Sequence, residues 1–252
     1  MKLQVQAICF FLMLSSMVFA QKGKETSPVS PVGNVTSTTA PYDVNKAIYR
    51  NALKYNDFQT AINAVFNMIA YNPNEATLKD TLTYLYYNNG QYVQSLLVGT
   101  EILEKSDTNQ NILEIVAISQ QNLGLYKESL ESYEKLYKLT KSVMHQYKIA
   151  TLQYTLKRYG ECGATIDKIL SSKDSDQKIN ISDANRQSQD VSIKAAVLNM
   201  NGVIYLELNQ PELAKKSFED ALKLEPTFML AKNNLELASK PTQQPQVQTP
   251  KK

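Results

Sequence analysis

Hydrophobic residues recur every three or four positions in a series of segments between residues 42 and 240. The segments are about 12 to 15 residues long, and short turns containing Asn, Gly or Asp separate them. This spacing is typical of amphipathic helices that bury one face. No convincing run of alternating hydrophobic and polar residues indicates a strand. The pattern therefore predicts an all-α fold built from helix pairs.

The helix pairs repeat along the chain. The aromatic residues Phe58, Tyr92 and Tyr126 stand 34 residues apart, and Tyr159 follows 33 residues later, each just after a turn. Three residues after each aromatic comes a small residue: Ala61, Ser95, Ser129 and Cys162. Small residues mark places where two helices cross closely, so these columns predict packing positions and not a reactive site.

The stretch from 198 to 226 carries the fullest version of the pattern, with Gly202, Tyr205, Ala214, Phe218, Ala221 and Pro226. A 34-residue period with these residue types resembles the tetratricopeptide repeat. The resemblance implies an α-solenoid of antiparallel helix pairs that forms a right-handed superhelix, with the first helix of each repeat lining a concave face. Five repeats are expected at 42–75, 76–109, 110–142, 143–176 and 195–228, with a polar insertion at 171–194 and a capping helix at 229–240.

The two ends of the chain differ in composition from this helical region. Residues 1–20 contain one lysine and an apolar run of about a dozen residues, a pattern that predicts a secretory signal peptide. Residues 21–41 are rich in Ser, Thr and Pro and are predicted to be a flexible leader, and the Pro- and Gln-rich residues 241–252 a disordered tail. The product is expected to be exported, to the periplasm or alternatively outside the cell, without membrane insertion after signal removal.

Charge and chemistry exclude several classes of function. Without Lys2 the chain keeps 26 of its 27 basic residues against 24 acidic ones, so no concentrated basic face for nucleic acid is predicted. His145 is the only histidine, and no carboxylate or cysteine cluster has metal-ligand spacing. We therefore expect no catalytic residue, cofactor or metal, and no enzyme activity. Cys162, in the small-residue column, is expected to be a buried and inert thiol.

The resemblance implies which residues would line the concave groove. They are Lys46, Arg50 and Lys54 in the first repeat, Asp80, Tyr84, Tyr87 and Asn88 in the second, Glu114, Ile118 and Gln121 in the third, Tyr147, Thr151 and Tyr154 in the fourth, and Asn199, Val203 and Leu206 in the fifth. Tyrosine combines a large rigid face with a hydroxyl, which suits a binding surface. The alternative interpretation is that the tyrosines pack against neighbouring helices and that the basic residues form a solvated face.

Two functional hypotheses follow. The first is a non-enzymatic interaction scaffold of the cell envelope that binds a peptide or protein segment in the groove. The second is a structural subunit of an envelope or secretion assembly, joined through helix faces or the flexible ends. Neither the partner nor the oligomeric state follows from the sequence.

Overall fold

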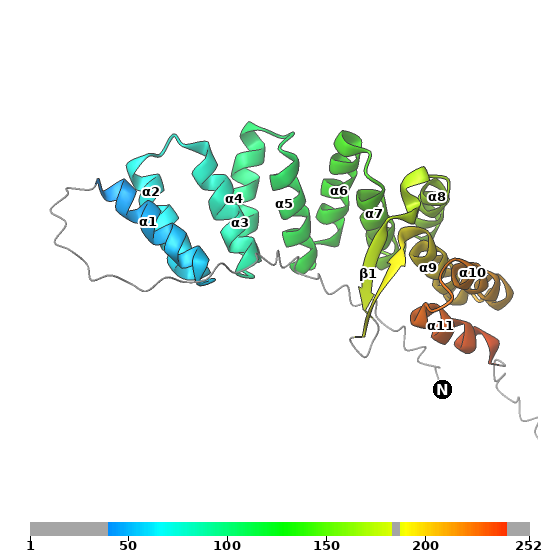
Figure 1. Cartoon of the computed structure of the whole chain (residues 1–252). Coiled ribbons are helices and arrows are strands. Elements are labelled where there is room, and N and C mark those ends of the chain that lie inside the picture. Colours follow the sequence, from blue (N-terminus) through cyan, green and yellow to red (C-terminus); the bar gives the residue numbers. More distant parts are fainter. Residues whose placement is uncertain (1–39, 183–186, 241–252) are drawn as a thin grey trace, which may run out of the picture. The chain divides into compact units, whose positions relative to one another are not determined.

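The structure is a computed structural model that describes residues 40–182 and 187–240 (Figure 1). The expected signal peptide, the leader up to residue 39 and the tail from 241 lie outside the described residues. The chain divides into two units, one ending at His145 and the other beginning at Gln146, and each is considered by itself.

The unit that ends at His145 is built from antiparallel helix pairs. Its helices are α1 Pro41–Lys54, α2 Phe58–Tyr71, α3 Ala76–Asn88, α4 Tyr92–Lys105, α5 Gln110–Asn122 and α6 Tyr126–Thr140. Each helix packs against the next in the chain, and α3 also packs against α5. The aromatic column falls at the start of every second helix, since Phe58, Tyr92 and Tyr126 are the first residues of α2, α4 and α6. The prediction of an all-α fold of paired helices is confirmed.

The second unit continues the pairing and adds a small sheet. Helix α7, Val143–Thr155, crosses the boundary between the units, and the following elements are α8 Tyr159–Leu170, the 3₁₀ helix η1 Lys173–Asp176, β1 Lys178–Ser182, β2 Ser188–Ser192, α9 Ile193–Glu207, α10 Pro211–Leu224 and α11 Met229–Ser239. Helix α9 packs against α8, α10, α11 and β2. Helix α11 covers the cluster formed by Ala214 and Phe218, to which it contributes Leu235 and Ala238.

The two strands correct the sequence analysis, which predicted no strand. Strands β1 and β2 lie in the polar insertion at 171–194 and form an antiparallel hairpin in which Ile179 faces Val191. Ile179, Ile181 and Val191 are buried. Only two isoleucines alternate with the Lys, Asn and Ser of β1, so the strand signal in the sequence is short and weak.

The small-residue column has a hydrogen-bonding role in three repeats. In these repeats the small side chain donates a hydrogen bond to the backbone carbonyl twelve residues earlier, on the first helix of the same pair. The bonds run from Ser95 Oγ to Thr83 O at 3.1 Å, from Ser129 Oγ to Ala117 O at 2.8 Å, and from Cys162 Sγ to Ala150 O at 3.2 Å. In the last repeat the same two columns hold Gly202 and Ala214, and a Cβ added to Gly202 would lie 2.4 Å from the ring of Phe218. These columns therefore fix how closely the two helices of a pair approach.

The turns inside the helix pairs share one backbone feature. The residue two positions before the start of the second helix has a positive φ in each pair: Asn56 (54°), Gly90 (72°), Gly124 (76°), Lys157 (57°) and Asn209 (58°). The left-handed conformation reverses the chain between antiparallel helices, and glycine or asparagine adopts it at the lowest steric cost. Lys157 is the exception in residue type, but it keeps the same backbone geometry.

Candidate functional site

The basic residues of α1 lie at the surface. Lys46, Arg50 and Lys54 are exposed and stand four residues apart, on one face of the helix. The ammonium of Lys54 lies 5.5 Å from the centroid of the Tyr55 ring. This face of α1 presents three positive charges to solvent.

Four tyrosines of the first unit lie near one another, and we call them the tyrosine surface. It consists of Tyr49 on α1, Tyr84 and Tyr87 on α3, and Tyr92 at the start of α4. Tyr84 is 55% exposed, whereas the other three are partly buried. The rings of Tyr87 and Tyr92 lie 6.3 Å apart at an angle of 58°. Asn88 is exposed at the end of α3, where its amide donates to the Tyr84 carbonyl at 2.8 Å.

Neighbouring members of the tyrosine surface influence one another's pKa. Partial burial, followed by the proximity of Tyr84, raises the pKa of Tyr49. Burial also raises the pKa of Tyr87, and Tyr92, Glu114 and Tyr84 add to the effect. These phenols therefore stay neutral and keep their hydroxyl hydrogens for donation.

Helix α5 places a carboxylate near this surface. Glu114 is partly exposed, and its Oε1 lies 3.8 Å from Nε2 of His145. Nδ1 of His145 is hydrogen-bonded to Oγ1 of Thr140 at 2.8 Å, which fixes the ring. Gln121 and Ile118 on α5 and Asp80 on α3 are partly exposed as well. The surface of the first unit thus joins aromatic, acidic and basic groups on the first helices.

Three residues expected in the groove lie in the core instead, which corrects the sequence analysis. Tyr147 is 2% exposed, Thr151 is 3% exposed and Asn199 is fully buried. The Thr151 hydroxyl donates to the Tyr147 carbonyl at 3.0 Å, and Asn199 Oδ1 accepts a hydrogen bond of 2.9 Å from Asn234 on α11. A ligand on the surface cannot reach these side chains.

The physical reason for the correction is that α7 and α9 are buried on nearly all sides. In α9 eight residues are buried, and the stretch from 195 to 206 contains no charged side chain. A helix that is apolar all round is an interior helix, not one with a free polar face. Val203 and Leu206 on α9 are partly exposed and belong to the packing around Phe218.

Tyr154, the remaining expected residue on α7, has a specific partner. Its hydroxyl donates to Oε1 of Glu207 at 2.7 Å, and the hydroxyl of Tyr159 donates to the other carboxylate oxygen of Glu207. The rings of Tyr154 and Tyr159 lie 6.1 Å apart. Burial, followed by the contact with Glu207, raises the pKa of Tyr159 to about 12. Tyr154 therefore helps to hold α9 in place.

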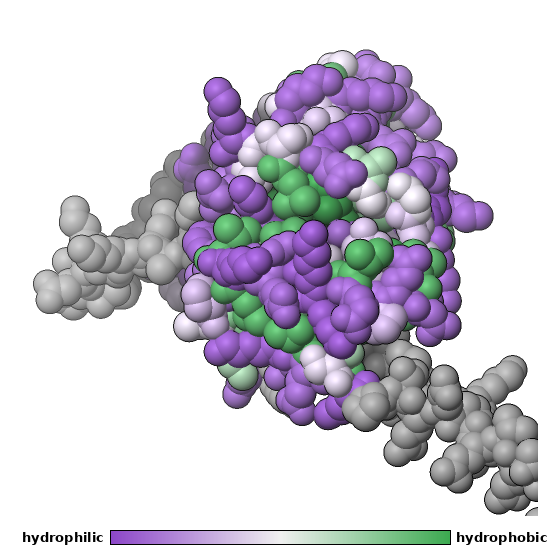
Figure 2. Space-filling view, turned by 90° about the vertical axis from the view of Figure 1, so that its right-hand side faces the viewer, coloured by the Kyte–Doolittle hydropathy of each residue, from purple (hydrophilic) through white to green (hydrophobic). Residues whose placement is uncertain are grey.

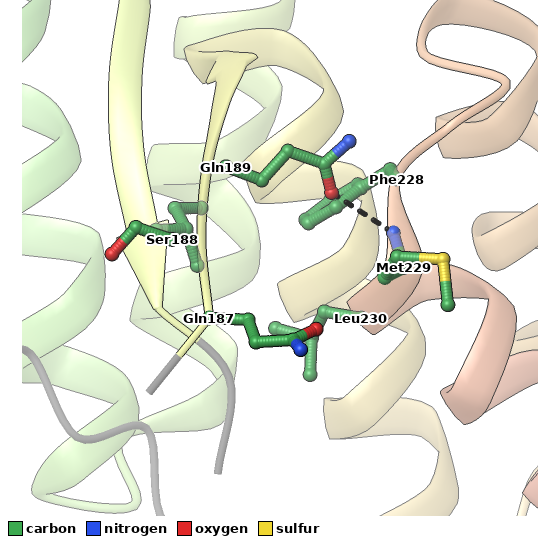
Figure 3. Close-up of a pocket in the computed structure, with 7 residues that line it drawn as sticks. Gln187, Ser188, Gln189, Phe228, Met229 and Leu230 are labelled. Atoms are coloured by element: carbon green, nitrogen blue, oxygen red, sulfur yellow. Dashed lines mark hydrogen bonds between the residues drawn. The ribbon is translucent and has the colours of Figure 1, made fainter. Parts of the chain in front are cut away.

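A small pocket lies between the hairpin and the connection from α10 to α11 (Figure 3). It has a volume of about 160 Å³ and is lined by Ile181, Gln187, Ser188, Gln189, Phe228, Met229 and Leu230. Gln189 bridges the two sides, because its Oε1 accepts from Met229 N at 3.0 Å and its Nε2 donates to Thr227 O at 2.8 Å. The pocket is small and its polar groups are used in docking the hairpin.

Other chemical features are few in the described part of the chain. No group of three or more His, Cys, Asp or Glu side chains there is arranged to hold a metal ion. Cys162 is fully buried, as expected, and desolvation raises the pKa of its thiol to about 12. None of the helices described has the length and apolar character to cross a membrane. Figure 2 shows hydrophobic side chains between hydrophilic ones on the face that it displays. In the second unit Leu213, Leu224 and Leu237 are exposed.

The expected residues omitted two members of the tyrosine surface. Tyr49 occupies the repeat position that Gly202 holds in the last repeat, and Tyr92 belongs to the aromatic column, which predicts packing positions. Both positions lie within the repeat pattern, so the sequence carries no separate signal for them.

Comparison with known proteins adds information about the fold. Neither a protein-family model nor a curated protein sequence matches the chain. Solved structures do match: the crystal structure of MamA protein is 16% identical with a TM-score of 0.58, covering 80% of this chain and 98% of that one. The crystal structure of YrrB, a TPR protein with an unusual peptide-binding site, is 12% identical with a TM-score of 0.59, covering 79% of this chain and all of that one.

A MamA structure from Desulfovibrio magneticus RS-1, beginning at residue 41, is 10% identical with a TM-score of 0.58 and covers 76% of this chain and 99% of that one. At such identities the likeness concerns the fold alone. Together with the helix pairs described above, it shows that the chain has the fold of tetratricopeptide-repeat proteins.

Proposed function

We propose that the chain is a non-enzymatic interaction scaffold of the cell envelope that binds a peptide or protein segment on the first helices of its repeats. The observation that carries the proposal is the tyrosine surface beside the exposed cations of α1. Tyr84 on α3 is 55% exposed, and Arg50 and Lys54 are exposed on α1, the first helix of the preceding repeat. Aromatic and arginine side chains dominate the binding energy of protein interfaces.

The contact geometry supports recognition of a partner with both apolar and polar groups. Tyr84 offers a rigid ring with little rotamer entropy to lose, and the neutral phenol of Tyr87 can donate a hydrogen bond. The cations of α1 would favour carboxylates at one end of the bound segment and speed its association. The YrrB structure, whose name records a peptide-binding site, agrees with a repeat protein of this fold binding a peptide.

The envelope location is part of the proposal and rests on the first twenty residues. Their single lysine and apolar run are typical of a secretory signal. Periplasmic export places the partner among envelope proteins, and release outside the cell is the alternative destination.

A matched pair of tyrosine substitutions tests the proposal. Tyr84→Ala removes the exposed member of the tyrosine surface, and Tyr71→Ala removes a tyrosine of similar exposure, 59%, at the end of α2. Partners captured from envelope extracts by the wild-type chain should be lost with Tyr84→Ala and Arg50→Glu and kept with Tyr71→Ala. Equal capture by all variants would contradict binding on the first helices.

The alternative function, a structural subunit joined through helix faces, is favoured by a different observation. Val93 and Leu97 stand four residues apart on α4 and are 52% and 66% exposed. If this face is the contact, Leu97→Ser abolishes capture and Tyr84→Ala does not.

A further inference from the structure

The backbone of β1 has an edge that no other segment pairs with in the described residues. Lys178 faces Ser192, and the amide of Ile193 donates to the Gln177 carbonyl at 2.9 Å. Gln177 and Ile193 therefore form a hydrogen-bonded pair. Hydrogen-bonded and non-hydrogen-bonded pairs alternate along an antiparallel ladder, so the next pair, Lys178 and Ser192, is a non-hydrogen-bonded one. The amide of Ser192 accordingly donates elsewhere, to Oε1 of Glu225 at 3.1 Å.

The pattern alternates along the hairpin. Pairs two residues apart are of the same kind, so Asn180 with Asp190 and Ser182 with Ser188 are also non-hydrogen-bonded pairs. The N–H and C=O groups of Lys178, Asn180 and Ser182 therefore point away from β2. Among the residues described, none of these groups has a partner outside the hairpin.

The outer edge of β2, in contrast, is engaged at one end within its own unit. The Ser192 amide is bound to Glu225 at the end of α10, and the side chain of Gln189 joins Thr227 to Met229 (Figure 3). Strand β2 also packs against α9. The β2 edge is thus partly engaged by its own unit, whereas the β1 edge has no partner among the described residues.

An open edge of this kind is a template for another strand. A two-stranded hairpin alone is marginally stable, and further strands stabilise it. Lys178 and Asn180 are exposed, while the side chains of Ile179 and Ile181 are buried on the other face of the hairpin. The edge can therefore gain a strand without moving its hydrophobic face.

We propose that β1 pairs with β1 of a second copy of this chain, so that two hairpins form one four-stranded antiparallel sheet in a symmetric dimer. The strand reads KINIS, and its central INI is the same in both directions about Asn180. Antiparallel pairing about Asn180 joins Asn180 to its own copy and Lys178 to Ser182 of the other copy. All the outward backbone groups of the three residues on each chain are then satisfied.

Charge and symmetry favour a second copy over an open chain of copies. The pairing places each lysine opposite a serine, so no like charges face each other. Ile179 of one chain lies beside Ile181 of the other, which continues the hydrophobic row across the sheet. Because the β1 edge pairs with the same edge of the second copy, the contact is isologous and closes after two copies.

Proline substitutions test the dimer while sparing the hairpin. The amide of Asn180 points away from β2, so Asn180→Pro keeps the backbone ladder of the hairpin and blocks the edge, at the loss of the side-chain bond from Asn180 Nδ2 to Asp190 Oδ1. Ser188→Pro is the matched control, because it removes an outward amide at the start of β2, on the other edge. Circular dichroism of both variants would verify that the fold is retained.

The measurement is molar mass by light scattering and sedimentation over a concentration series of the full chain purified from its host. We expect wild type and Ser188→Pro to dimerise, and Asn180→Pro to show a dissociation constant at least about tenfold higher. A wild-type chain that stays monomeric, or an Asn180→Pro variant that dimerises like wild type, would overturn the proposal.

Cross-linking provides a second readout that does not depend on the proline variant folding. Paired residues of an antiparallel ladder have Cα atoms about 5.5 Å apart, so Asn180→Cys should be joined to its copy by a short bismaleimide. Ser188→Cys, one strand farther from the edge, should give little product. Cys162 is fully buried and should not react. Equal cross-linking of both variants would count against the β1 pairing.

Discussion

Matching repeat positions on the first helices differ in exposure between the two units. In the unit ending at His145, α1 and α3 present Arg50 and Tyr84 to solvent. In the unit beginning at Gln146, the matching positions of α7 and α9 hold the buried Thr151 and the partly exposed Val203. The repeat fixes where a helix lies, but the residues around it decide which of its faces is free. Recognition of a partner on the first helices is therefore proposed for one end of the domain.

The largest expected effect on stability is at Tyr147. Its size tells whether Tyr147 is a core residue or a binding residue. Tyr147→Ala should lower the free energy of unfolding by about 3 to 5 kcal/mol, because it removes a fully buried aromatic side chain. The Tyr147 hydroxyl has no hydrogen-bond partner in the described residues, so Tyr147→Phe should match or exceed the stability of wild type. Urea unfolding of the three proteins measures both differences.

Tyr147→Ala as stable as wild type would mean that Tyr147 is accessible and would restore it as a binding residue. The comparison between the units would then fail at one of its buried positions.

The next largest loss of stability is expected where two helices of the last repeat approach closely. Gly202→Ala should destabilise the chain by about 1 to 3 kcal/mol, because its methyl group would overlap the Phe218 ring. Gly163→Ala on α8 is the control, since nothing lies within 4 Å of the added atom, and it should be neutral or stabilise the helix by up to about 1 kcal/mol. Thermal unfolding of both variants measures whether only Gly202→Ala lowers the stability, as the contact with Phe218 predicts.

A smaller and pH-dependent effect concerns the docking of the hairpin. The ammonium of Lys178, and then the Ser192 amide, hold the pKa of Glu225 below its ordinary value. A carboxylate with a lowered pKa stabilises the folded state above its unfolded pKa, and this contribution disappears as the pH falls through the folded pKa. Glu225→Gln should therefore cost about 1 kcal/mol at pH 7, and the difference from wild type should vanish well below pH ~4.

Denaturant titrations at pH 7 and pH 3 test this sign. Glu212→Gln is the control, because the Glu212 side chain is 82% exposed in its pair with Lys215 and should change stability little at either pH. A Glu225→Gln deficit that grows on acidification would contradict the assigned role of this carboxylate.

The smallest effect on stability is expected at the proposed binding surface. Tyr84→Ala should change the free energy of unfolding by no more than about 0.5 kcal/mol, because Tyr84 is 55% exposed and is not among the residues of the core cluster that contains Leu82, Leu85 and Tyr86. The measurement is urea unfolding under the conditions used for Tyr147→Ala. A large loss of stability would show that Tyr84 is a packing residue, as the alternative interpretation of the tyrosines holds.

The helical fold could be predicted from the sequence because its signals recur. A turn residue, an aromatic and a small side chain at a 34-residue spacing each have one mechanical function, and the structure places Tyr92 and Tyr126 at the starts of their helices. The hairpin could not be predicted in the same way. Its strands occur once, their outer positions are polar, and Val191 on β2 faces Ile179 on a segment twelve residues earlier.

The candidate site was predicted in part for a related reason. Matching positions between repeats identified the exposed Arg50 and Tyr84, whose helices carry polar residues on a free face. The same matching failed for Thr151 and Asn199, because burial depends on all the neighbours of a helix and not on its register. The uncharged run from 195 to 206 on α9 was the one local sign of this burial.

Site-specific photo-crosslinking in cells tests the central claim most directly. A photoreactive phenylalanine analogue would replace Tyr84 on α3, Tyr71 on α2 or Leu97 on α4, three exposed positions that differ in the face they occupy. We expect a discrete adduct with another protein from position 84 and none from 71 or 97. An adduct from 97 or 71 in the absence of one from 84 would contradict recognition by the tyrosine surface.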